Sequence, residues 1–453
     1  MIHTTMLLLL GAFTAYGANV NVPFERYKLA NGLRVILSQD NAVPVASVYL
    51  LYNVGARSEE KGRTGFAHLF EHMMFQGTKN APKGMHFQQV ESNGGTLNGS
   101  THPDYTDYFE ILPSNKLAVA LWLESDRMRS LAITKENLDN QKEAVKQERR
   151  LNFDNQPYNT AIVDVFPAMA FRNWSNSHSL IGSFEDLNAA TVEDVALFFK
   201  THYSPSNAVL AISGDIRIPE IKKMIEEYFG DIQPQPPAKP PNLAEPEQTE
   251  ARWQTYKDNL ARVPLVALAY PGPKRRSPDY YALSMLDVIL TAGESSRLYL
   301  SMVKEKKSVL NLEANLGWPF AKPSDYRDPG IYGVSFIFHP SFTARQVVEQ
   351  FEAELGRLET SPVDAKELER ARATLLADRI RGLQSTMTRA TLLAQYELFD
   401  DDPSLVNKEL DLFLAVTPGQ IRDVARRYLT KRKQSVLEVI PTPRDAKKQE
   451  AGK

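Results

Sequence analysis

TVEDVALFFKTHYSPSNAVLAI, residues 191–212, recurs in outline as TPGQIRDVARRYLTKRKQSVLEVI, residues 417–440. In each copy a threonine, Thr191 or Thr417, precedes a predicted helix, and a run typical of a β-strand closes the unit. Threonine is a favoured helix N-cap, and Pro418 suits the first helical position. The offset of about 226 residues between the copies indicates an internal repeat.

A second pair of matching segments lies at nearly the same offset. TKENL, residues 134–138, begins a predicted helix that runs through Glu148, and DAKEL, residues 364–368, begins one that runs through Asp378. Two matches at one offset are stronger than either match alone. They indicate that the chain contains a duplicated unit.

Prolines crowd near the middle of the chain, where they exclude helices and strand ladders and favour an extended linker. They are Pro234, Pro236, Pro237, Pro240, Pro241 and Pro246. We therefore predict a linker over residues 233–251. Strands predicted at 44–52 and 263–270 are each followed by a predicted helix. We expect an α+β fold of two homologous domains, each a mixed β-sheet packed with helices.

Composition excludes several kinds of chemistry. The chain has 453 residues, with 53 Lys and Arg against 55 Asp and Glu, and this net charge of -2 argues against a nucleic-acid partner. It has no cysteine, so disulfides, thiolate nucleophiles and Cys-ligated zinc or iron–sulfur sites are excluded. A transition metal would need His, Asp or Glu ligands, and the chain has only 8 His.

The N-terminal segment differs from the rest of the chain. Residues 6–18 are apolar, too short to span a bilayer, and end in small residues. We predict a signal peptide over residues 1–18, cleaved after Gly17 or Ala18, and hence a periplasmic or secreted protein. The alternative is a flexible or wrongly assigned N-terminus, because the segment lacks Lys and Arg. No membrane-spanning segment is expected in the mature chain.

The stretch HLFEH, residues 68–72, is the motif that carries chemistry. On a helix, His68 and His72 are one turn apart and share a face, so both imidazoles can bind one metal ion. Glu71 lies near that face, where a carboxylate can take a proton from a metal-bound water. The alternative is a metal-free pair of histidines on a buried helix. The apolar neighbours and the rarity of the spacing favour the metal.

A third ligand has to come from elsewhere in the chain. On the helix predicted from Glu136 to Leu151, Leu138, Val145 and Glu148 share one face. Because the two apolar residues mark that face as buried, the Glu148 carboxylate needs a strong partner. Periodicity leaves two alternatives open, a metal ligand or a buried ion pair with an arginine. The single histidines His86, His178, His202 and His339 are interpreted as structural, and His102 as an exposed loop residue.

The motif and its flanks resemble a known family. HLFEH has the inverted order of the usual HExxH zinc motif, and TGFAHLFEHMMFQGT, residues 64–78, is similar to the pitrilysin, insulin-degrading enzyme and mitochondrial processing peptidase family. The segments 94–101, 141–150 and 203–215 also resemble that family. The resemblance covers essentially the whole mature chain and corresponds to a short form of the family.

The resemblance implies a zinc metalloendopeptidase with one Zn2+ per chain. His68, His72 and Glu148 fall on the family's zinc ligands and Glu71 falls on its general base. Asn98 and Gly99 fall on positions that hold the substrate backbone, where a peptide is bound as an added strand at a sheet edge. The resemblance thus favours the ligand interpretation of Glu148.

Two departures from the family concern the surroundings of the zinc site. An acidic residue that many members carry before the Glu ligand is Gln141 here, and VKEKKSVLN, residues 303–311, has Lys304 but no tyrosine. We therefore expect a dimer, either of identical chains or with a zinc-free homologous subunit that supplies the missing residues. The expected partners are peptide substrates, with no nucleic acid.

These predictions divide the chain into a signal peptide (1–18), a catalytic zinc-binding domain (19–232), a linker (233–251), a homologous second domain without a zinc site (252–442) and a flexible tail (443–453). A non-proteolytic scaffold or assembly subunit of the same fold is the main alternative. A zinc hydrolase of non-peptide substrates is a third hypothesis, supported by the metal motif alone.

Overall fold

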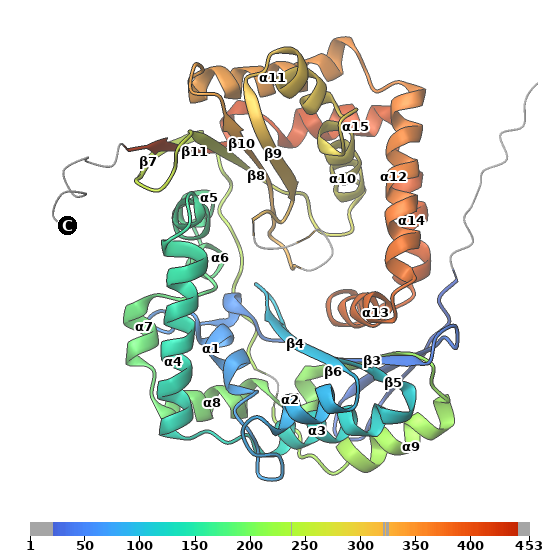
Figure 1. Ribbon diagram of the computed structural model, residues 1–453. Coiled ribbons are helices and arrows are strands. Elements are labelled where there is room, and N and C mark those ends of the chain that lie inside the picture. Colours follow the sequence, from blue (N-terminus) through green and yellow to red (C-terminus); the bar gives the residue numbers. More distant parts are fainter. Residues whose placement is uncertain (1–20, 237, 320–321, 323–325, 443–453) are drawn as a thin grey trace, which may run out of the picture.

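The computed structural model of the protein describes residues 21–236, 238–319, 322 and 326–442. Within these residues, two β-sheets are packed with helices, which confirms the predicted α+β class (Figure 1). The predicted signal peptide and the predicted tail lie outside the described residues. We use "first half" for the chain from β1 to α9, and "second half" for the chain from β7 to β11.

The first half contains a mixed sheet of the order β1-β2-β6-β3-β5-β4. Its strands are β1 (Glu25–Lys28), β2 (Arg34–Gln39), β3 (Val45–Tyr52), β4 (Thr96–Thr101), β5 (Thr106–Pro113) and β6 (Ala208–Gly214). β2 and β6 are parallel and the other neighbours are antiparallel. β4 is therefore an edge strand with one side free to pair with another chain.

The second half repeats this arrangement in the order β7-β11-β8-β10-β9. Its strands are β7 (Arg252–Asp258), β8 (Leu265–Pro271), β9 (Val309–Leu316), β10 (Ile331–Phe338) and β11 (Ser435–Pro441). β7 and β11 are parallel and the remaining pairs are antiparallel. This order matches β2-β6-β3-β5-β4 of the first sheet, so the structure confirms two related units.

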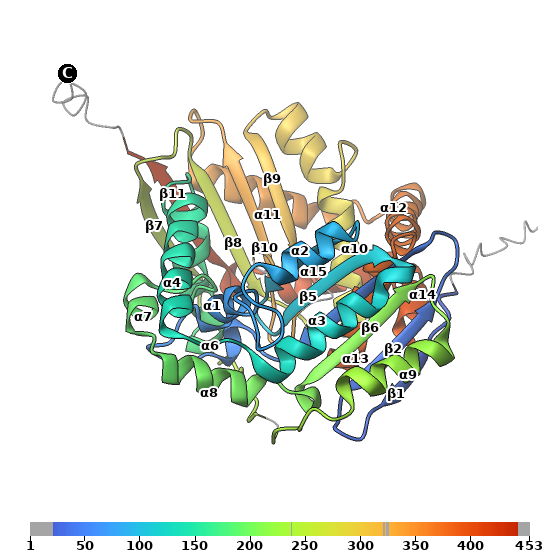
Figure 2. The same ribbon diagram turned by 60° about the horizontal axis from the view of Figure 1, so that its bottom comes forward.

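Helices connect and cover the two sheets (Figures 1 and 2). In the first half they are α1 (Phe66–Met73), α2 (Met85–Ser92), α3 (Leu117–Ser130), α4 (Lys135–Arg149), α5 (Phe166–Ala170), α6 (Trp174–Ser177), α7 (Phe184–Ala189), α8 (Val192–His202) and α9 (Ile218–Phe229). In the second half they are α10 (Pro278–Thr291), α11 (Ala344–Thr360), α12 (Ala365–Leu383), α13 (Thr386–Asp400), α14 (Leu405–Leu414) and α15 (Pro418–Tyr428).

Shorter helical turns complete the connections. They are η1 (Ala56–Ser58), η2 (Ser114–Lys116), η5 (Pro205–Asn207) and η7 (Lys431–Lys433), with wider π-helical turns at η3 (Arg150–Asp154), η4 (Ala161–Val165) and η6 (Tyr299–Glu305). No helix or strand lies in the described part of the segment between Phe229 and Arg252, in keeping with its prolines. Among the described residues, no helix is both long and apolar enough to cross a membrane.

The two helices by which the repeat was recognised begin where the sequence predicts. Thr191 and Thr417 each cap a helix in a full capping box, with Asp194 and Gln420 returning the hydrogen bond to the cap. The second pair of starts is also confirmed, because Thr134 and Asp364 accept a hydrogen bond at the beginning of α4 and α12. Local cap chemistry thus sets these boundaries in both halves.

Helices of each half pack against the sheet of the other half. α13 of the second half lies across the first sheet, where Leu393 and Tyr396 share a buried cluster with Tyr49, Leu51 and Val209 (Figure 1). In return, α5 packs against the second sheet in a cluster that includes Phe166 and Leu437. The two halves are therefore joined by apolar cores as well as by the linker.

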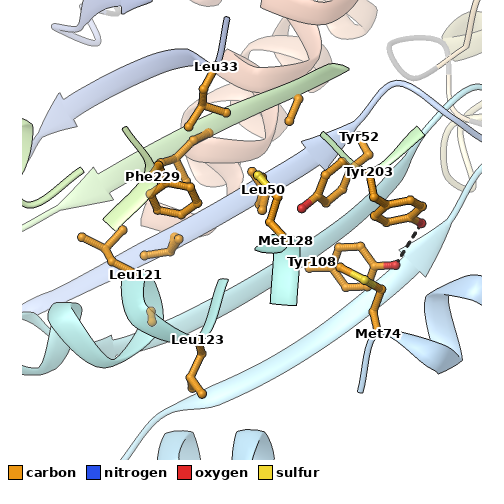
Figure 3. Packing of buried hydrophobic residues seen from close by; sticks show 14 of the residues in the cluster. Leu33, Leu50, Tyr52, Met74, Tyr108, Leu121, Leu123, Met128, Tyr203 and Phe229 are labelled. Carbon is orange, nitrogen blue, oxygen red and sulfur yellow. Dashed lines mark hydrogen bonds between the residues drawn. The ribbon is translucent and has the colours of Figure 1, made fainter. Parts of the chain in front are cut away.

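The core of the first half fixes the strands beside the candidate site. Tyr52, Tyr108 and Tyr203 pack together, and the hydroxyls of Tyr108 and Tyr203 are 3.1 Å apart (Figure 3). Leu121 and Phe229 pack in the same cluster from the covering helices (Figure 3). Because Tyr108 lies on β5 opposite Gly99, this core holds the edge strand β4 in place.

Candidate metal centre and active site

Helix α1 presents the three residues of the HLFEH motif. Its apolar side chains Phe66, Leu69, Phe70 and Met73 are buried in the first core and anchor one face of the helix. The other face carries the two histidines, whose ring centroids are 4.8 Å apart, and the glutamate. The predicted geometry, with one turn between the imidazoles, is therefore present.

The start of α1 is held by a buried carboxylate. The N-cap Gly65 makes no side-chain cap of its own, and Glu59 accepts from the backbone N–H of Gly65 at 2.9 Å and of Ala67 at 2.8 Å. His178 Nε2 lies 3.0 Å from the Glu59 carboxylate. An anion at a helix N-terminus pairs with the dipole and with the free N–H groups, so this pair fixes the helix that carries the motif.

Helix α4 brings Glu148 to the two histidines. Glu148 Oε2 lies 3.6 Å from His68 Nε2 and 3.3 Å from His72 Nε2. Of the two alternatives left by periodicity, an arginine ion pair is absent among the described residues, because both ionic contacts of Glu148 are with histidines. Its side chain is 34% exposed, so it is less buried than the sequence predicted. The exposed part of the Glu148 side chain shows that the C-terminal end of α4 is accessible to solvent.

The spacing of these atoms fits a tetrahedral zinc site. Ligand bonds of about 2.0–2.2 Å place neighbouring ligand atoms about 3.3–3.4 Å apart. The two N···O distances, 3.3 and 3.6 Å, are close to that value and longer than the about 2.7–2.9 Å of a charge-assisted hydrogen bond. Two imidazoles and one carboxylate are also the donors of catalytic zinc sites, which keep one position open.

Electrostatics in the site favour the metal-binding form of His68 and Glu148 but the protonated form of His72. Burial lowers the pKa of His68 to about 4, which keeps this imidazole neutral. Interaction with the His72 ring lowers the pKa of Glu148, so that residue is a carboxylate. Burial alone would lower the pKa of His72, but the carboxylates of Glu148 and Glu71 outweigh it and raise that pKa. A bound cation would oppose that effect.

Gln141 orients the second imidazole. Its Oε1 lies 3.3 Å from His72 Nδ1, on the side of the ring away from Glu148. A metal-binding histidine usually donates its other N–H to such an oxygen, which fixes the ring and its tautomer. Gln141 therefore occupies the position where the family resemblance led us to expect a carboxylate, and it supplies a neutral acceptor instead.

Glu71 lies between α1 and the edge strand β4. Thr101 Oγ1 donates to Glu71 Oε2 at 2.6 Å. Burial raises the pKa of Glu71 to about 7, although the hydrogen bond from Thr101 acts in the opposite direction. A carboxyl group with a pKa near neutrality can both accept and release a proton at physiological pH.

The two predicted substrate-binding residues are on β4. Asn98 is exposed at the free edge, whereas Gly99 is buried and faces Glu71. A Cβ at Gly99 would lie 3.2 Å from Glu71 Cγ and 3.1 Å from the Tyr108 ring. The structure thus brings Gly99 against helix α1, and Asn98 to an edge where an extended peptide can pair.

A second cluster of possible ligands has a different character. His86, Glu110 and Glu124 lie within 4.8 Å of one another and are all buried. Arg127 pairs with both carboxylates, with its Nε 2.8 Å from Glu124 Oε2 and its Nη2 3.7 Å from Glu110 Oε1. The guanidinium supplies the positive charge that a metal would provide, so this is a buried ion network formed by side chains of α2, α3 and β5.

Some residues in and near the site were not predicted to have a role there. Glu59 and Thr101 are missed because their partners lie outside their own segments, although the β4 motif already pointed to the strand that carries Thr101. His178 was interpreted as structural, and its contact with Glu59 is of that kind. His102 lies in the loop between β4 and β5, as predicted, but it is half-buried rather than exposed: it stacks on Tyr105 and lies 3.2 Å from Asp107.

The stretch 303–311, which has Lys304 but no tyrosine, is in the second half. Lys304 is part of the turn η6, where its nearest ionic partner is Glu294 at 3.7 Å. Leu310 and Asn311 are exposed on the edge strand β9. Among the described residues, no contact joins these three residues to His68, His72 or Glu148.

Two family models match consecutive parts of the chain. The model "Insulinase (Peptidase family M16)" matches residues 34–183, and "Peptidase M16 inactive domain" matches residues 189–375. The first includes all of α1 and α4, and the second includes α10 and most of α12. The candidate ligands His68, His72 and Glu148 therefore all lie within the part of the chain that the first model matches.

Similar proteins extend over most of the chain. "Zinc protease PqqE" of Helicobacter pylori is 27% identical and is aligned over 94% of this chain and 95% of its own length. "Mitochondrial-processing peptidase subunit beta" of Homo sapiens is 25% identical, over 93% of this chain and 86% of its own. A crystal structure of a protease from Helicobacter pylori has a TM-score of 0.87 and 26% identity, covering 93% of this chain and 100% of that one.

The fold is shared with more distant proteins as well. The crystal structure of a peptidase M16 inactive domain from Pseudomonas fluorescens has a TM-score of 0.81 at 17% identity, covering 94% of this chain and 100% of that one. The family models, the relatives and the shared fold agree with one another. On this evidence the chain belongs to the M16 peptidase family, the family of insulinase and of the mitochondrial-processing peptidases.

Proposed function

We propose that the protein is a zinc metalloendopeptidase that hydrolyses peptide bonds in peptides or extended segments. The observation that carries this proposal is the convergence of His68, His72 and Glu148 beside Glu71. Similar proteins named zinc protease support it. All four residues are present, as a catalytic rather than a purely structural family member requires.

The residues of the chain have distinct roles in the proposed reaction. His68, His72 and Glu148 would hold one Zn2+, which supplies a water of lowered pKa and polarises the scissile carbonyl. Glu71 takes the proton of the attacking water and transfers it to the leaving amine, which needs a carboxyl group of near-neutral pKa. Gln141 keeps the His72 ring in place through Nδ1.

The edge strand β4 is the proposed binding site for the peptide backbone. Asn98 lies at its exposed edge and Gly99 beside the base. An added strand is read mainly through main-chain hydrogen bonds, so we expect broad tolerance of side chains. A requirement for an extended segment would favour unfolded or short peptides over folded proteins.

We further propose that the enzyme acts as a dimer outside the cytoplasm. The apolar run 6–18 supports export, and one protein of this fold is the periplasmic protease PqqL of Escherichia coli. A dimer, of identical chains or with a zinc-free homologue, is supported by similarity to subunits of the mitochondrial-processing peptidase. The partner would supply the residues absent from 303–311.

The main alternative is a scaffold or assembly subunit that has kept the fold without proteolysis. A matched set of proteins separates the two: wild type, Glu71→Gln, and Glu143→Gln as a control. Glu143 is a glutamate of α4, and its side chain is 68% exposed and paired with Lys146. Zinc content is measured together with cleavage of internally quenched, unstructured peptides.

The proposal expects about one zinc per chain in all three proteins and cleavage in the wild type and the control. Glu71→Gln removes the base and keeps the ligands, so cleavage should fall by about 100-fold or more. Zinc-loaded wild type that cleaves none of the peptides, alone or with a homologous subunit, would support the scaffold. Undiminished cleavage by Glu71→Gln would refute the role of Glu71.

A further inference from the structure

We infer that Thr101 is a positioning residue that fixes the Glu71 carboxylate for proton transfer, so that β4 both receives the peptide and sets the base. The inference rests on the proposed function. Thr101 Oγ1 donates to Glu71 Oε2 at 2.6 Å, a length typical of a strong hydrogen bond to a carboxylate. Among the described residues, no other side chain donates to that carboxylate.

The strand position that carries the Thr101 hydroxyl is fixed by pairing with β5. Thr101, the last residue of β4, is paired with Thr106 of β5. Thr106 Oγ1 in turn donates to Val54 O at 2.8 Å. A β-branched side chain on a strand has few χ1 rotamers, so the direction of its hydroxyl is restricted. The donor is therefore carried by a rigid element rather than by a mobile loop.

The stem of the base is confined by the same strand. Gly99 and Thr101 are two residues apart and so lie on one face of β4, the face towards α1. A Cβ at Gly99 would lie 3.2 Å from Glu71 Cγ and 3.2 Å from the Phe75 ring. The missing side chain lets β4 approach α1 closely enough for the Thr101 hydroxyl to reach the carboxylate.

The consequence is a geometric link between substrate and base. A peptide paired with β4 and the Glu71 carboxylate, which is hydrogen-bonded to Thr101, are both positioned by the same strand. Their relative position then does not depend on the flexible side chain of a glutamate alone. A base held within hydrogen-bond reach of its proton is what general-base catalysis requires, and small misplacements lower the rate.

The test compares Thr101→Val, which keeps the shape and removes the hydroxyl, with Thr101→Ser, which keeps the hydroxyl. Thr255→Val is the control, because Thr255 is an exposed threonine on a strand of the second sheet. Cleavage of a quenched peptide is measured as separate kcat and KM values. Zinc affinity is measured by competition with a chelator, and peptide affinity by fluorescence anisotropy on metal-free protein.

We expect Thr101→Val to lower kcat by about 10- to 100-fold, the usual effect of losing an outer-shell partner. KM, zinc affinity and peptide affinity should stay near the wild-type values. Thr101→Ser should recover most of kcat, and Thr255→Val should match the wild type. In a Glu71→Gln background, Thr101→Val should cause little further loss, because the two residues act as one unit.

A readout independent of turnover is the crystal structure of metal-free Thr101→Val, in which the Glu71 carboxylate should leave the position it holds in the wild type. An active wild type with an unchanged kcat in Thr101→Val would overturn the inference alone. Equal losses in the Val and Ser variants, accompanied by weaker zinc binding, would show a structural role and also overturn it. A zinc-loaded wild type without cleavage would instead overturn the proposed function.

Discussion

The two sheets of the protein share a strand order and differ in the helix that follows the central strand. After β3, helix α1 is short and carries His68, Glu71 and His72 beside the edge strand β4. After β8, helix α10 is longer, and its buried residues are mostly apolar or aromatic, among them Leu283, Leu286 and Leu290. The same topology therefore carries the proposed metal site in one half and an apolar packing face in the other.

The helices that carried the second repeat differ in the same way. The end of α4 places Glu148 beside two imidazoles, whereas the matching end of α12 places Asp378 in an exposed contact with Arg381. Duplication supplied two equivalent positions, and only one has partners that give it a chemical role. The candidate site thus consists of a few side chains placed on a fold that forms in the other half without them.

The largest effect should come from removing the carboxylate in one half and not in the other. Glu148→Gln should lower zinc affinity and cleavage by more than about 100-fold, because a first ligand matters more than an outer-shell partner. Asp378→Asn, its counterpart in the repeat, should leave both unchanged. Metal analysis and peptide cleavage check the pair. Equal behaviour of the two variants would break the comparison.

The starts of the two corresponding helices offer a contrast in stability. Glu59→Gln removes the buried carboxylate that holds the start of α1 and that contacts His178. This change should lower the free energy of unfolding by about 3 kcal/mol. Ser277→Ala removes an ordinary cap from α10, which should cost about 1 kcal/mol. Denaturant titration of both variants measures the difference. A smaller loss for Glu59→Gln than for Ser277→Ala would contradict the anchoring role.

Gln141 allows the outer shell of the site to be tested within one helix. Gln141→Ala removes the oxygen that lies 3.3 Å from His72 Nδ1 and should weaken zinc binding by about 10-fold or more. Gln147→Ala, at an exposed position of α4, is the control and should have no effect. Zinc affinity is measured by chelator competition. Indistinguishable affinities would show that Gln141 does not orient the ring.

A pH effect is expected from the second half. Burial raises the pKa of Asp287 on α10 to about 7, from an ordinary value of 3.8. The folded state thus binds a proton that the unfolded state has lost, and the free energy of unfolding should fall as pH rises from about 4 to 7. The slope contributed by one such group is at most about 1.4 kcal/mol per pH unit.

Asp287→Asn keeps an oxygen that can accept from Tyr332, which donates to Asp287 at 2.9 Å, and it cannot ionise. The stability of the variant relative to the wild type should therefore increase with pH across that range. Denaturant titrations at pH 5 and pH 8 measure this difference. A constant difference at the two pH values would show that Asp287 does not titrate in this way.

The sequence predicts features that depend on residues close together in the chain, such as helix caps. It leaves open the contacts between residues that are far apart in the chain. Thr191 and Thr417 cap helices through residues three positions away, so their roles could be read locally. The one-turn spacing of His68 and His72 is equally local. Glu148 is different, because periodicity shows which face it shares but not what that face meets. The long-range contact with α1 decides between ligand and ion pair.

Two features needed the folded chain. Thr101 meets Glu71 only because β4 and α1 approach at Gly99, and Glu59 reaches the start of α1 from the preceding loop. The placement of α13 on the first sheet is a further example, since it joins a helix of the second half to strands of the first. Such pairings depend on shape complementarity between distant segments, which no local pattern encodes.

The most direct test of the central claim is anomalous X-ray diffraction at the zinc edge from crystals of the full chain grown with zinc. We predict one strong peak per chain, between His68, His72 and Glu148, and none within the second half. Absence of that peak in zinc-containing crystals, or a dominant peak in the cluster of His86, Glu110 and Glu124, would contradict the account.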